Sequence, residues 1–367
     1  MNNLQRLFTE QGQSPWLDNL RRGWITSGEL SQWVERGIRG LTSNPAIFQK
    51  AIEGSADYDE QFSGLIASGS SVESAYWDLV TSDIEGALRA LKPVYDSSNG
   101  KDGFVSVEVD PALARDGNAT TKAARDLHIS IDQPNLMVKI PGTSEGLPSI
   151  QTMIGEGRSI NVTLIFSVPR YVEVIEAYIS GLEACLESGA TDLSGIASVA
   201  SFFISRTDTE VDRRLDELGT PEALALRGQA ALAQAQVAYG AFTRAFSGPR
   251  WETLVRSGAR VQRPLWASTS TKNPDFPDTL YVDELIGPDT VNTMPDNTIA
   301  AVLDRASVAR TIDRDPEQAQ AVLDGLVQVG IDLDDVALVL EEQGVASFVK
   351  SFDELITSLA TKAQDLA

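Results

Sequence analysis

Cysteine and histidine are nearly absent from this chain, which has one of each among its 367 residues. A single cysteine, Cys185, excludes an internal disulfide, and its place in an amphipathic helical pattern predicts a small core residue. A single histidine, His128, excludes a His-rich metal site and leaves no recognisable Ser-His-Asp triad. We expect His128 to be structural, so acid–base chemistry falls mainly to Asp, Glu, Lys or Tyr side chains.

The sequence also lacks long apolar runs. None approaches the roughly 18 residues that a membrane-spanning helix needs. Residues 1–16 lack a basic region followed by an apolar one, so we expect no signal peptide. These absences predict a cytoplasmic protein with no membrane partner.

Positive charge is scarce. The chain has 30 Lys and Arg against 52 Asp and Glu, a formal net charge of −22, and its pI is about 4.4. Such a balance argues against nucleic acid and anionic membranes as partners. An anionic substrate would need a local cluster of Arg, Lys and backbone N–H groups to overcome the overall repulsion.

Short strand-like runs alternate with longer helical patterns, which predicts a parallel sheet with crossover helices. There are eight runs, and the glycine-rich dinucleotide motif is missing. Both facts favour a closed (β/α)8 TIM barrel over an open doubly wound sheet. We find no repeat or linker and expect one domain, 1–367. The expected strands are 15–19, 37–42, 103–109, 135–140, 159–166, 198–204, 263–267 and 290–293.

Helix signals fill the intervals. About 60 residues separate the second and third runs, so we expect a helical insertion there. Thr26 and Glu29 suggest a capping box, Ser167 with Pro169 a helix start, and Thr220-Pro221 the start of an Ala-rich helix to about residue 246. Residues 296–367 should complete and cover the barrel as extra C-terminal helices. The expected helices include 27–36, 56–67, 72–92, 298–309, 315–328, 333–343 and 346–365.

One apolar run, Leu136–Pro141, contains a lysine, Lys139. A strand of this composition should be buried on both faces, where a charged ammonium is costly. Burial enlarges the fraction of free amine, which is the form that attacks a carbonyl. The alternative is that Lys139 lies at the strand end and extends its ammonium group to water.

Alternate residues of a barrel strand point inward, and this rule places a polar group on the inward face of almost every run. A ring of polar groups in a barrel is costly unless they bond one another or a ligand. Most lie near the C-terminal strand ends, where such barrels carry their chemistry. The expected inward pairs are Trp16 with Asp18, Thr42 with Asn44, Ser106 with Glu108, Met137 with Lys139, Asn161 with Thr163, Ser201 with Phe203, and Trp266 with Ser268; Leu164 and Phe166 are expected to face outward.

A desolvated lysine near two carboxylates, Glu108 and Asp18, favours Schiff-base chemistry on a carbonyl. Two carboxylates in different surroundings can divide the proton transfers. Asn44 and Asn161 are candidates to hold hydroxyl groups. Arg206 and Lys272 are candidates to bind a phosphate at the barrel rim, against the alternative that both are solvated surface residues.

Two long motifs resemble the signatures of the transaldolase family, Gly40–Phe48 (GLTSNPAIF) and Met137–Leu147 (MVKIPGTSEGL). Five shorter motifs match in order: Trp16–Asp18, Val107–Val109, Ile160–Ser167, Trp266–Thr269 and Asn292–Pro295. The similarity runs from about residue 16 to 295, and the chain length suits the longer bacterial transaldolases.

The resemblance implies that Lys139 forms a Schiff base with a ketose phosphate such as sedoheptulose 7-phosphate. Glu108 would move protons through a water held by Thr163, and Asp18 would take the C4 hydroxyl proton as C3–C4 breaks. Erythrose 4-phosphate would leave, and glyceraldehyde 3-phosphate would accept the dihydroxyacetone unit, giving fructose 6-phosphate in the pentose phosphate pathway.

The resemblance also implies binding roles. Asn44, Asn161 and Ser201 would hold hydroxyl groups, and Phe203 would line the site and limit water. Arg206 and Ser268 would contact the phosphate. Many relatives have an arginine where this chain has Ser270, so we expect Lys272 to substitute for it. No cofactor or metal is implied, and family members occur as monomers and homodimers.

Two other functions stay open. A fructose 6-phosphate aldolase would release free dihydroxyacetone without an acceptor. Glu108 and Phe203 favour the transferase, because aldolase relatives tend to carry Gln and Tyr at the matching positions. A non-catalytic sugar-phosphate-binding protein would keep Arg206 and Asn44 but has no reason to keep Lys139, Glu108 and Asp18 together.

Overall fold

In the computed structural model, which describes residues 1–365, the eight strands pair in sequence order into a closed, all-parallel barrel. β1 pairs with β8 and closes the ring. This confirms the (β/α)8 barrel expected from the sequence. The strands are β1 Gln13–Leu17, β2 Leu41–Thr42, β3 Val105–Glu108, β4 Leu136–Pro141, β5 Ile160–Ile165, β6 Ser198–Phe203, β7 Arg263–Ala267 and β8 Thr290–Met294.

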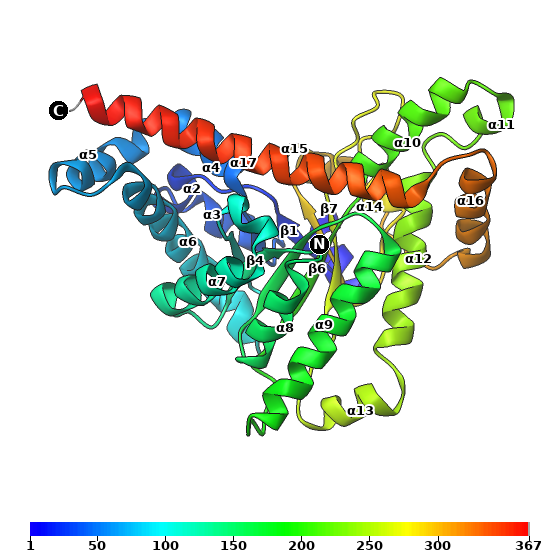
Figure 1. Cartoon of the computed structure of the whole chain (residues 1–367), viewed down its shortest axis with the longest axis horizontal. Helices are drawn as coiled ribbons and strands as arrows, with labels where there is room; N and C mark the ends of the chain where they lie inside the picture. Colours follow the sequence, from blue (N-terminus) through cyan, green and yellow to red (C-terminus); the bar gives the residue numbers. More distant parts are fainter. Residues whose placement is uncertain (366–367) are drawn as a thin grey trace.

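Helices surround the barrel and extend well beyond it on two sides, with α5 on the left and α11 and α16 on the right in Figure 1. Up to the fourth strand they are α1 Asn3–Gln11, α2 Arg22–Thr26, α3 Glu29–Glu35, α4 Pro45–Glu53, η1 Ala56–Tyr58, α5 Asp59–Ala67, α6 Val72–Ser97, η2 Pro111–Arg115 and α7 Gly117–Ile131. The others are α8 Leu147–Gly155, α9 Val168–Glu187, α10 Ser205–Leu218, α11 Pro221–Leu224, α12 Ala230–Ala245, α13 Gly248–Arg256, α14 Leu280–Asp283, α15 Asp296–Arg305, α16 Pro316–Gln328 and α17 Leu333–Asp365. None of the helices in residues 1–365 is long and apolar enough to cross a membrane.

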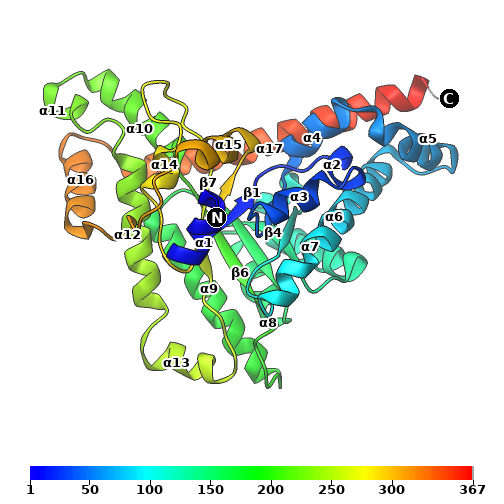
Figure 2. The same ribbon diagram turned by 180° about the vertical axis from the view of Figure 1, so that it is seen from behind.

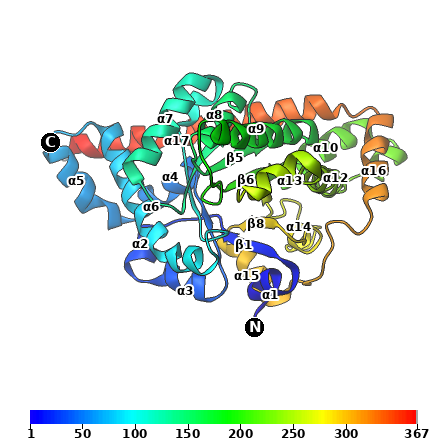
Figure 3. The same ribbon diagram turned by 90° about the horizontal axis from the view of Figure 1, so that it is seen from below.

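The helical insertion after β2 is present as α4, η1 and α5, ahead of the long crossover helix α6. Seen from behind, α1, α2 and α3 lie on the side of the barrel where β1 meets β8 (Figure 2). From below, α1 and α15 lie side by side there (Figure 3), in agreement with their direct contacts. The additional helices therefore pack around the barrel, and residues 1–365 contain no second sheet.

Side chains cap several helices, and among them the cap at Ser167 was predicted from the sequence. The Ser167 side chain accepts from Arg170 N at the start of α9, and Pro169 lies in the first turn. At α4, the Asn44 side chain accepts from Ile47 N. These side chains satisfy backbone N–H groups that have no partner within the helix.

Three helix predictions are wrong. Thr26 ends α2, and α3 begins after Gly28, so the capping box does not form. The Ala-rich helix is broken after Leu224, where Gly228 adopts φ +70°, a left-handed conformation that favours glycine. The two C-terminal helices expected at 333–343 and 346–365 are one continuous helix, α17.

α17 crosses the C-terminal mouth of the barrel from the side of α10 and α16 to the side of α5 (Figure 1). Gly344 permits its close approach, because a Cβ atom there would lie 2.8 Å from Leu164 Cδ2. The mouth of the barrel is therefore partly roofed by a helix that follows β8 by almost 40 residues in the sequence.

The inward and outward alternation holds for most strands. Trp16, Met137, Val199 and Phe203 belong to the interior cluster, whereas Val105, Val107 and Val138 pack outward against the helices. The prediction is wrong near the ends of β5 and β7. Leu164 and Phe166 join the interior cluster, while Trp266 packs outward and Leu265 and Ala267 face inward.

The deviation in β5 has a backbone cause, whereas Ser268 follows β7 and redirects only its own side chain and those after it. Leu164 has φ +60° beside a register irregularity between Val162 and Ile165, and Ser268 has φ +56° directly after β7. A left-handed residue reverses the alternation of the side chains that follow it. This explains why Ser268 still faces the site although Trp266 does not.

Candidate active site

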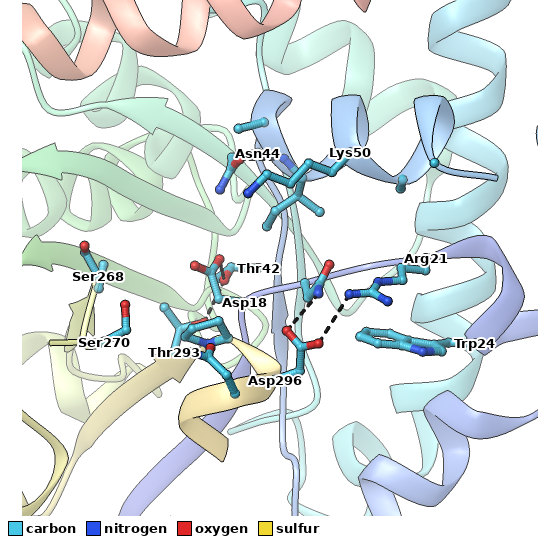
Figure 4. A pocket seen from close by; sticks show the side chains of 18 of the residues that line it. Asp18, Arg21, Trp24, Thr42, Asn44, Lys50, Ser268, Ser270, Thr293 and Asp296 are labelled. Atoms are coloured by element: carbon cyan, nitrogen blue, oxygen red, sulfur yellow. Dashed lines mark hydrogen bonds and ion pairs between the residues drawn. The ribbon is translucent and has the colours of Figure 1, made fainter. Parts of the chain in front are cut away.

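A cavity of about 1030 Å³ opens at the C-terminal end of the barrel. Its walls come from the ends of β1, β2 and β4 to β8, from α4 and from α17. Figure 4 shows Asp18, Thr42 and Thr293 in the middle, Ser268 and Ser270 on one side, and Arg21 and Trp24 on the other. Nine of the eleven predicted site residues line this cavity: Asp18, Asn44, Lys139, Thr163, Ser201, Phe203, Arg206, Ser268 and Lys272.

Lys139 lies at the floor of the cavity. The register of β3 and β4 sets Glu108 directly beside it. Its Nζ donates to Glu108 Oε2 at 3.0 Å and to the Ser43 carbonyl oxygen at 3.0 Å. Only 5% of Lys139 is exposed, so its amine is buried inside the barrel. The alternative that Lys139 extends to bulk water is wrong.

Glu108 lies behind Lys139 and does not line the main cavity. Burial raises the pKa of the Glu108 carboxyl, and the adjacent Lys139 opposes that rise. Its second oxygen, Oε1, is buried and has no hydrogen-bond partner in the described part of the chain, and the same holds for Thr163 Oγ1. Glu108 Oε1 and Thr163 Oγ1 are thus two buried polar atoms near the amine without a hydrogen-bond partner within residues 1–365. This is unusual, because buried polar groups normally have partners.

Asp18 lies at the end of β1 and is the second carboxylate of the site. Thr42 Oγ1 donates to its Oδ1 at 2.7 Å, and the Thr42 and Thr293 hydroxyls lie 2.7 Å apart. Burial raises the pKa of the Asp18 carboxyl, whereas the Thr42 hydrogen bond and the charges of Lys139 and Lys272 lower it. The two carboxylates thus occupy different surroundings, one against the lysine and one in a cluster of hydroxyls.

Asn161 is fully buried and lies below the cavity wall, so it is the other predicted residue that does not line the cavity. Its Oδ1 accepts from Ser201 Oγ at 2.7 Å, and its Nδ2 donates to Ser106 Oγ at 3.0 Å. The amide therefore orients the Ser201 hydroxyl, which does line the cavity.

Besides Lys139, Arg21 and Arg22, three further cations line the cavity: Arg206 of α10, Lys272 after β7 and Lys50 of α4. None of them has a carboxylate within ion-pair distance among residues 1–365, although acids far outnumber bases in this chain. Partial burial lowers the pKa of Lys272, and the charges of Arg206 and Lys50 lower it further. Burial lowers the pKa of the Arg206 guanidinium. A group of cations that repel one another and form no ion pair among the described residues is typical of an anion site.

Lys50 and Phe348 are among the lining residues that the sequence reasoning missed. Lys50 follows Asn44 by one and a half helical turns, and Figure 4 shows it extending from α4 across the cavity. Its position gave no signal, because a spacing of six residues does not place two side chains on the same face of a helix. Phe348 of α17 lies with its ring centroid 5.9 Å from Lys139 Nζ. No local pattern signals it, since over 200 residues separate it from the lysine.

A side pocket extends the cavity toward Arg21 and Trp24. Arg21 Nη2 lies 3.3 Å from Asp296 Oδ2, and Asn19 Nδ2 donates to the other oxygen of Asp296 at 3.2 Å (Figure 4). Here the charges are paired, in contrast to the three cations. Residues 1–365 contain no group of three or more His, Cys, Asp and Glu side chains arranged to hold a metal ion.

Comparison with known proteins agrees with this geometry. Residues 15–359 match the family model described as transaldolase/fructose-6-phosphate aldolase. A transaldolase of Mycobacterium leprae is 49% identical over 97% of this chain and 96% of its own length, and a transaldolase of Thermobifida fusca is 49% identical over 97% of both. Transaldolase 2 of Streptomyces avermitilis is 47% identical over the whole chain and 99% of its own length. The chain belongs to the transaldolase/fructose-6-phosphate aldolase family.

Proposed function

We propose that this enzyme is a transaldolase, a transferase that moves a dihydroxyacetone unit from sedoheptulose 7-phosphate to glyceraldehyde 3-phosphate. The products are erythrose 4-phosphate and fructose 6-phosphate, so the enzyme acts in the pentose phosphate pathway. The observation that carries the proposal is the buried Lys139 amine, held between Glu108 and the Ser43 carbonyl at the floor of a cavity that three unpaired cations line.

The first chemical step is attack of the Lys139 amine on the C2 carbonyl. The attacking nitrogen must lose a proton, and the carbinolamine oxygen must gain protons to leave as water. Glu108 touches the amine and has a free oxygen, which makes it the group to transfer these protons. A water between it and the free Thr163 hydroxyl would relay them, because both groups lack other partners.

Cleavage needs a base on the other side of the imine. Asp18 takes the C4 hydroxyl proton, the C3–C4 bond breaks, and its electron pair moves into the imine to give an enamine on Lys139. The released aldehyde leaves, and the reverse sequence joins the three-carbon unit to the acceptor. The Thr42 hydrogen bond holds Asp18 in place for both directions.

The other residues bind substrate. Asn44 and Ser201 hold hydroxyl groups, and Asn161 acts through Ser201, whose hydroxyl it orients. Phe203 lines the cavity and limits water. The phosphate binds at Arg206, Ser268 and Lys272, and we add Lys50 because it repels Lys272 across the same space.

A borohydride trap tests the central claim. With fructose 6-phosphate as donor, reduction should fix a three-carbon adduct on the peptide that contains Lys139. Lys139→Arg keeps the charge beside Glu108 but cannot form the imine, and it should remain unlabelled. Labelling of another lysine, or of the Lys139→Arg protein, overturns the assignment.

The aldolase alternative is decided by the acceptor. A transaldolase turns over only when glyceraldehyde 3-phosphate or another aldehyde acceptor is present, whereas an aldolase releases dihydroxyacetone without one. Steady release of dihydroxyacetone without an acceptor, at the rate of the complete reaction, would reject the transferase. Cytoplasmic location and a monomeric or homodimeric state complete the proposal, the latter open to light scattering in solution.

A further inference from the structure

A second cavity, of about 610 Å³, lies at the opposite end of the barrel. We call it the basal pocket and define it by Phe8, Ser14, Arg39, Lys101, Arg260 and Arg263. Ser14, Ser198 and Arg263 are at or next to the first residues of β1, β6 and β7, which places the pocket at the N-terminal mouth. None of its residues takes part in the proposed reaction.

The basal pocket gathers positive charge in a strongly acidic protein. Arg39, Lys101, Arg260 and Arg263 line it, against the carboxylates of Asp102 and Asp289. The surplus of two positive charges contrasts with the net charge of −22 for the whole chain. Cations concentrated in a cavity raise the local concentration of anions there.

Asp102 serves to anchor this cluster. It is 1% exposed and accepts from Trp16 Nε1 at 2.9 Å, from Arg39 Nε at 2.8 Å and from Arg263 Nη2 at 3.3 Å. Its lone pairs are therefore occupied by groups that it holds in place. A buried carboxylate with several donors fixes the orientation of the guanidinium groups it binds.

Donors remain free above this anchor. The two terminal nitrogens of Arg39 make no hydrogen bond within residues 1–365, nor does Lys101 Nζ. The Arg39 guanidinium carbon lies 3.5 Å from the centroid of the Phe8 ring, which fixes its plane. Arg260 is held by the carbonyls of Asn99 and Gly100. The free N–H groups of Arg39 are thus held in place without an acceptor in the described part of the protein, and the exposed Lys101 adds a second free cation beside them.

The rest of the lining is apolar. Phe8, Met137, Ala197, Ala259 and Val261 contribute to the walls. An inorganic ion would leave this apolar lining exposed to water, whereas an ester with an apolar body would bury it. We propose that the basal pocket binds a phosphate monoester with a small apolar body, its dianion on Arg39 and Lys101, at a site separate from the reaction site.

Phenyl phosphate is a suitable probe, and its binding can be measured by calorimetry. The protein for this measurement carries Arg206→Ala and Lys272→Ala, because these changes should weaken phosphate binding at the reaction site. We expect saturable binding that excess fructose 6-phosphate does not displace. Lys101→Glu in this background should weaken it at least tenfold. Lys122→Glu is the matched control, because Lys122 is an exposed lysine of α7 outside the basal pocket and has the same change of charge.

The proposal would be overturned by an absence of saturable binding, by equal effects of Lys101→Glu and Lys122→Glu, or by phenol binding as tightly as phenyl phosphate. Benzoate tests whether the pocket prefers a carboxylate. If benzoate bound more tightly than phenyl phosphate, the phosphate ester would be rejected as the ligand. The outcome is independent of the proposed activity, because Lys101→Glu in the otherwise unchanged protein should leave the transaldolase rate and KM unaltered.

Discussion

Asp18 gives the sharpest prediction for a single residue, since burial raises the pKa of its carboxyl. Above that raised pKa the folded protein buries a charge, which costs stability; as the pH falls through it, the carboxyl protonates and the cost disappears. Asp18→Asn should therefore raise the free energy of unfolding at pH 7, with a gain that shrinks toward pH 4. It should lower kcat by about 10²- to 10⁴-fold, the usual contribution of a positioned base.

Urea unfolding at several pH values and steady-state kinetics measure the two effects. Asp18→Asn keeps the acceptor for the Thr42 hydroxyl, so the fold is not disturbed through that contact. Thr42→Val is the control, because it removes the hydrogen bond but leaves the carboxylate. If Asp18→Asn were destabilising at pH 7, Asp18 would be a structural ion partner instead of a buried base.

The two lysines of the phosphate cluster form a second prediction. A hydrogen bond to a charged group contributes about 1.5–3 kcal/mol, so Lys272→Ala and Lys50→Ala should each raise the KM for fructose 6-phosphate about tenfold to a hundredfold. The KM for unphosphorylated fructose should stay the same. Lys122→Ala, outside the cavity, is the control. An unchanged KM for fructose 6-phosphate in Lys272→Ala would remove Lys272 from the site, and the same holds for Lys50.

For single residues, the sequence was enough to predict the positions of those site residues whose placement follows from strand alternation. Glu108 and Lys139 fall beside each other because both lie on inward positions of neighbouring strands with matching register. Lys50 could not be singled out, because a lysine on a helix is normally solvated and only the tertiary structure directs it over the cavity. Asn161 is fully buried and does not line the cavity, and each end of its amide makes one hydrogen bond, to Ser106 and from Ser201; its predicted contact with substrate stays a prediction.

Among the elements, α17 makes the most testable contribution, through Phe348. Its ring is 5% exposed and faces the Lys139 amine, so it shields the enamine from water. Phe348→Ala should increase severalfold the dihydroxyacetone released without acceptor, relative to transfer. It should also cost about 3–5 kcal/mol of stability, as for other buried Phe→Ala changes. Product analysis by chromatography gives the ratio.

Phe348→Leu separates shielding from folding. Leucine keeps an apolar cover and most of the packing, so this variant should release little free dihydroxyacetone. A parallel fall of transfer and release in Phe348→Ala, with no change in their ratio, would show that the ring serves packing alone.

The start of α9 was predicted, because the Ser167 side chain caps the helix and Pro169 lies in its first turn. Element boundaries were not predictable where one backbone conformation overrides the pattern. Leu164 and Ser268 take left-handed φ values that glycine would normally signal. The continuity of 333–343 with 346–365 was not predicted, because Gly344 normally indicates a helix end. In this structure Gly344 lies within α17 and permits its close approach to Leu164.

For the whole molecule, the alternation of eight apolar runs with helices was enough to predict the closed barrel, because few other arrangements bury eight parallel strands. The path of α17 could not be predicted in this way. Its course over the mouth depends on contacts with segments more than a hundred residues away, such as Arg115 with Glu341 at 2.7 Å and Arg214 with Asp335 at 2.7 Å.

These contacts make α17 part of one folding domain, which we propose spans the chain. Its buried apolar residues are Val336, Leu340, Phe348, Phe352, Leu355 and Leu359. At roughly 1.5–3 kcal/mol for each buried side chain, they contribute about 10 kcal/mol, as much as the whole stability of a typical domain. A chain ending at Asp332 should therefore lose its near-UV circular dichroism and bind a hydrophobic dye. Lys362→Ala removes only a half-exposed ion pair with Asp59 and should change stability by less than about 1 kcal/mol. A shortened chain that kept its unfolding midpoint would make α17 an independent lid on a self-sufficient barrel.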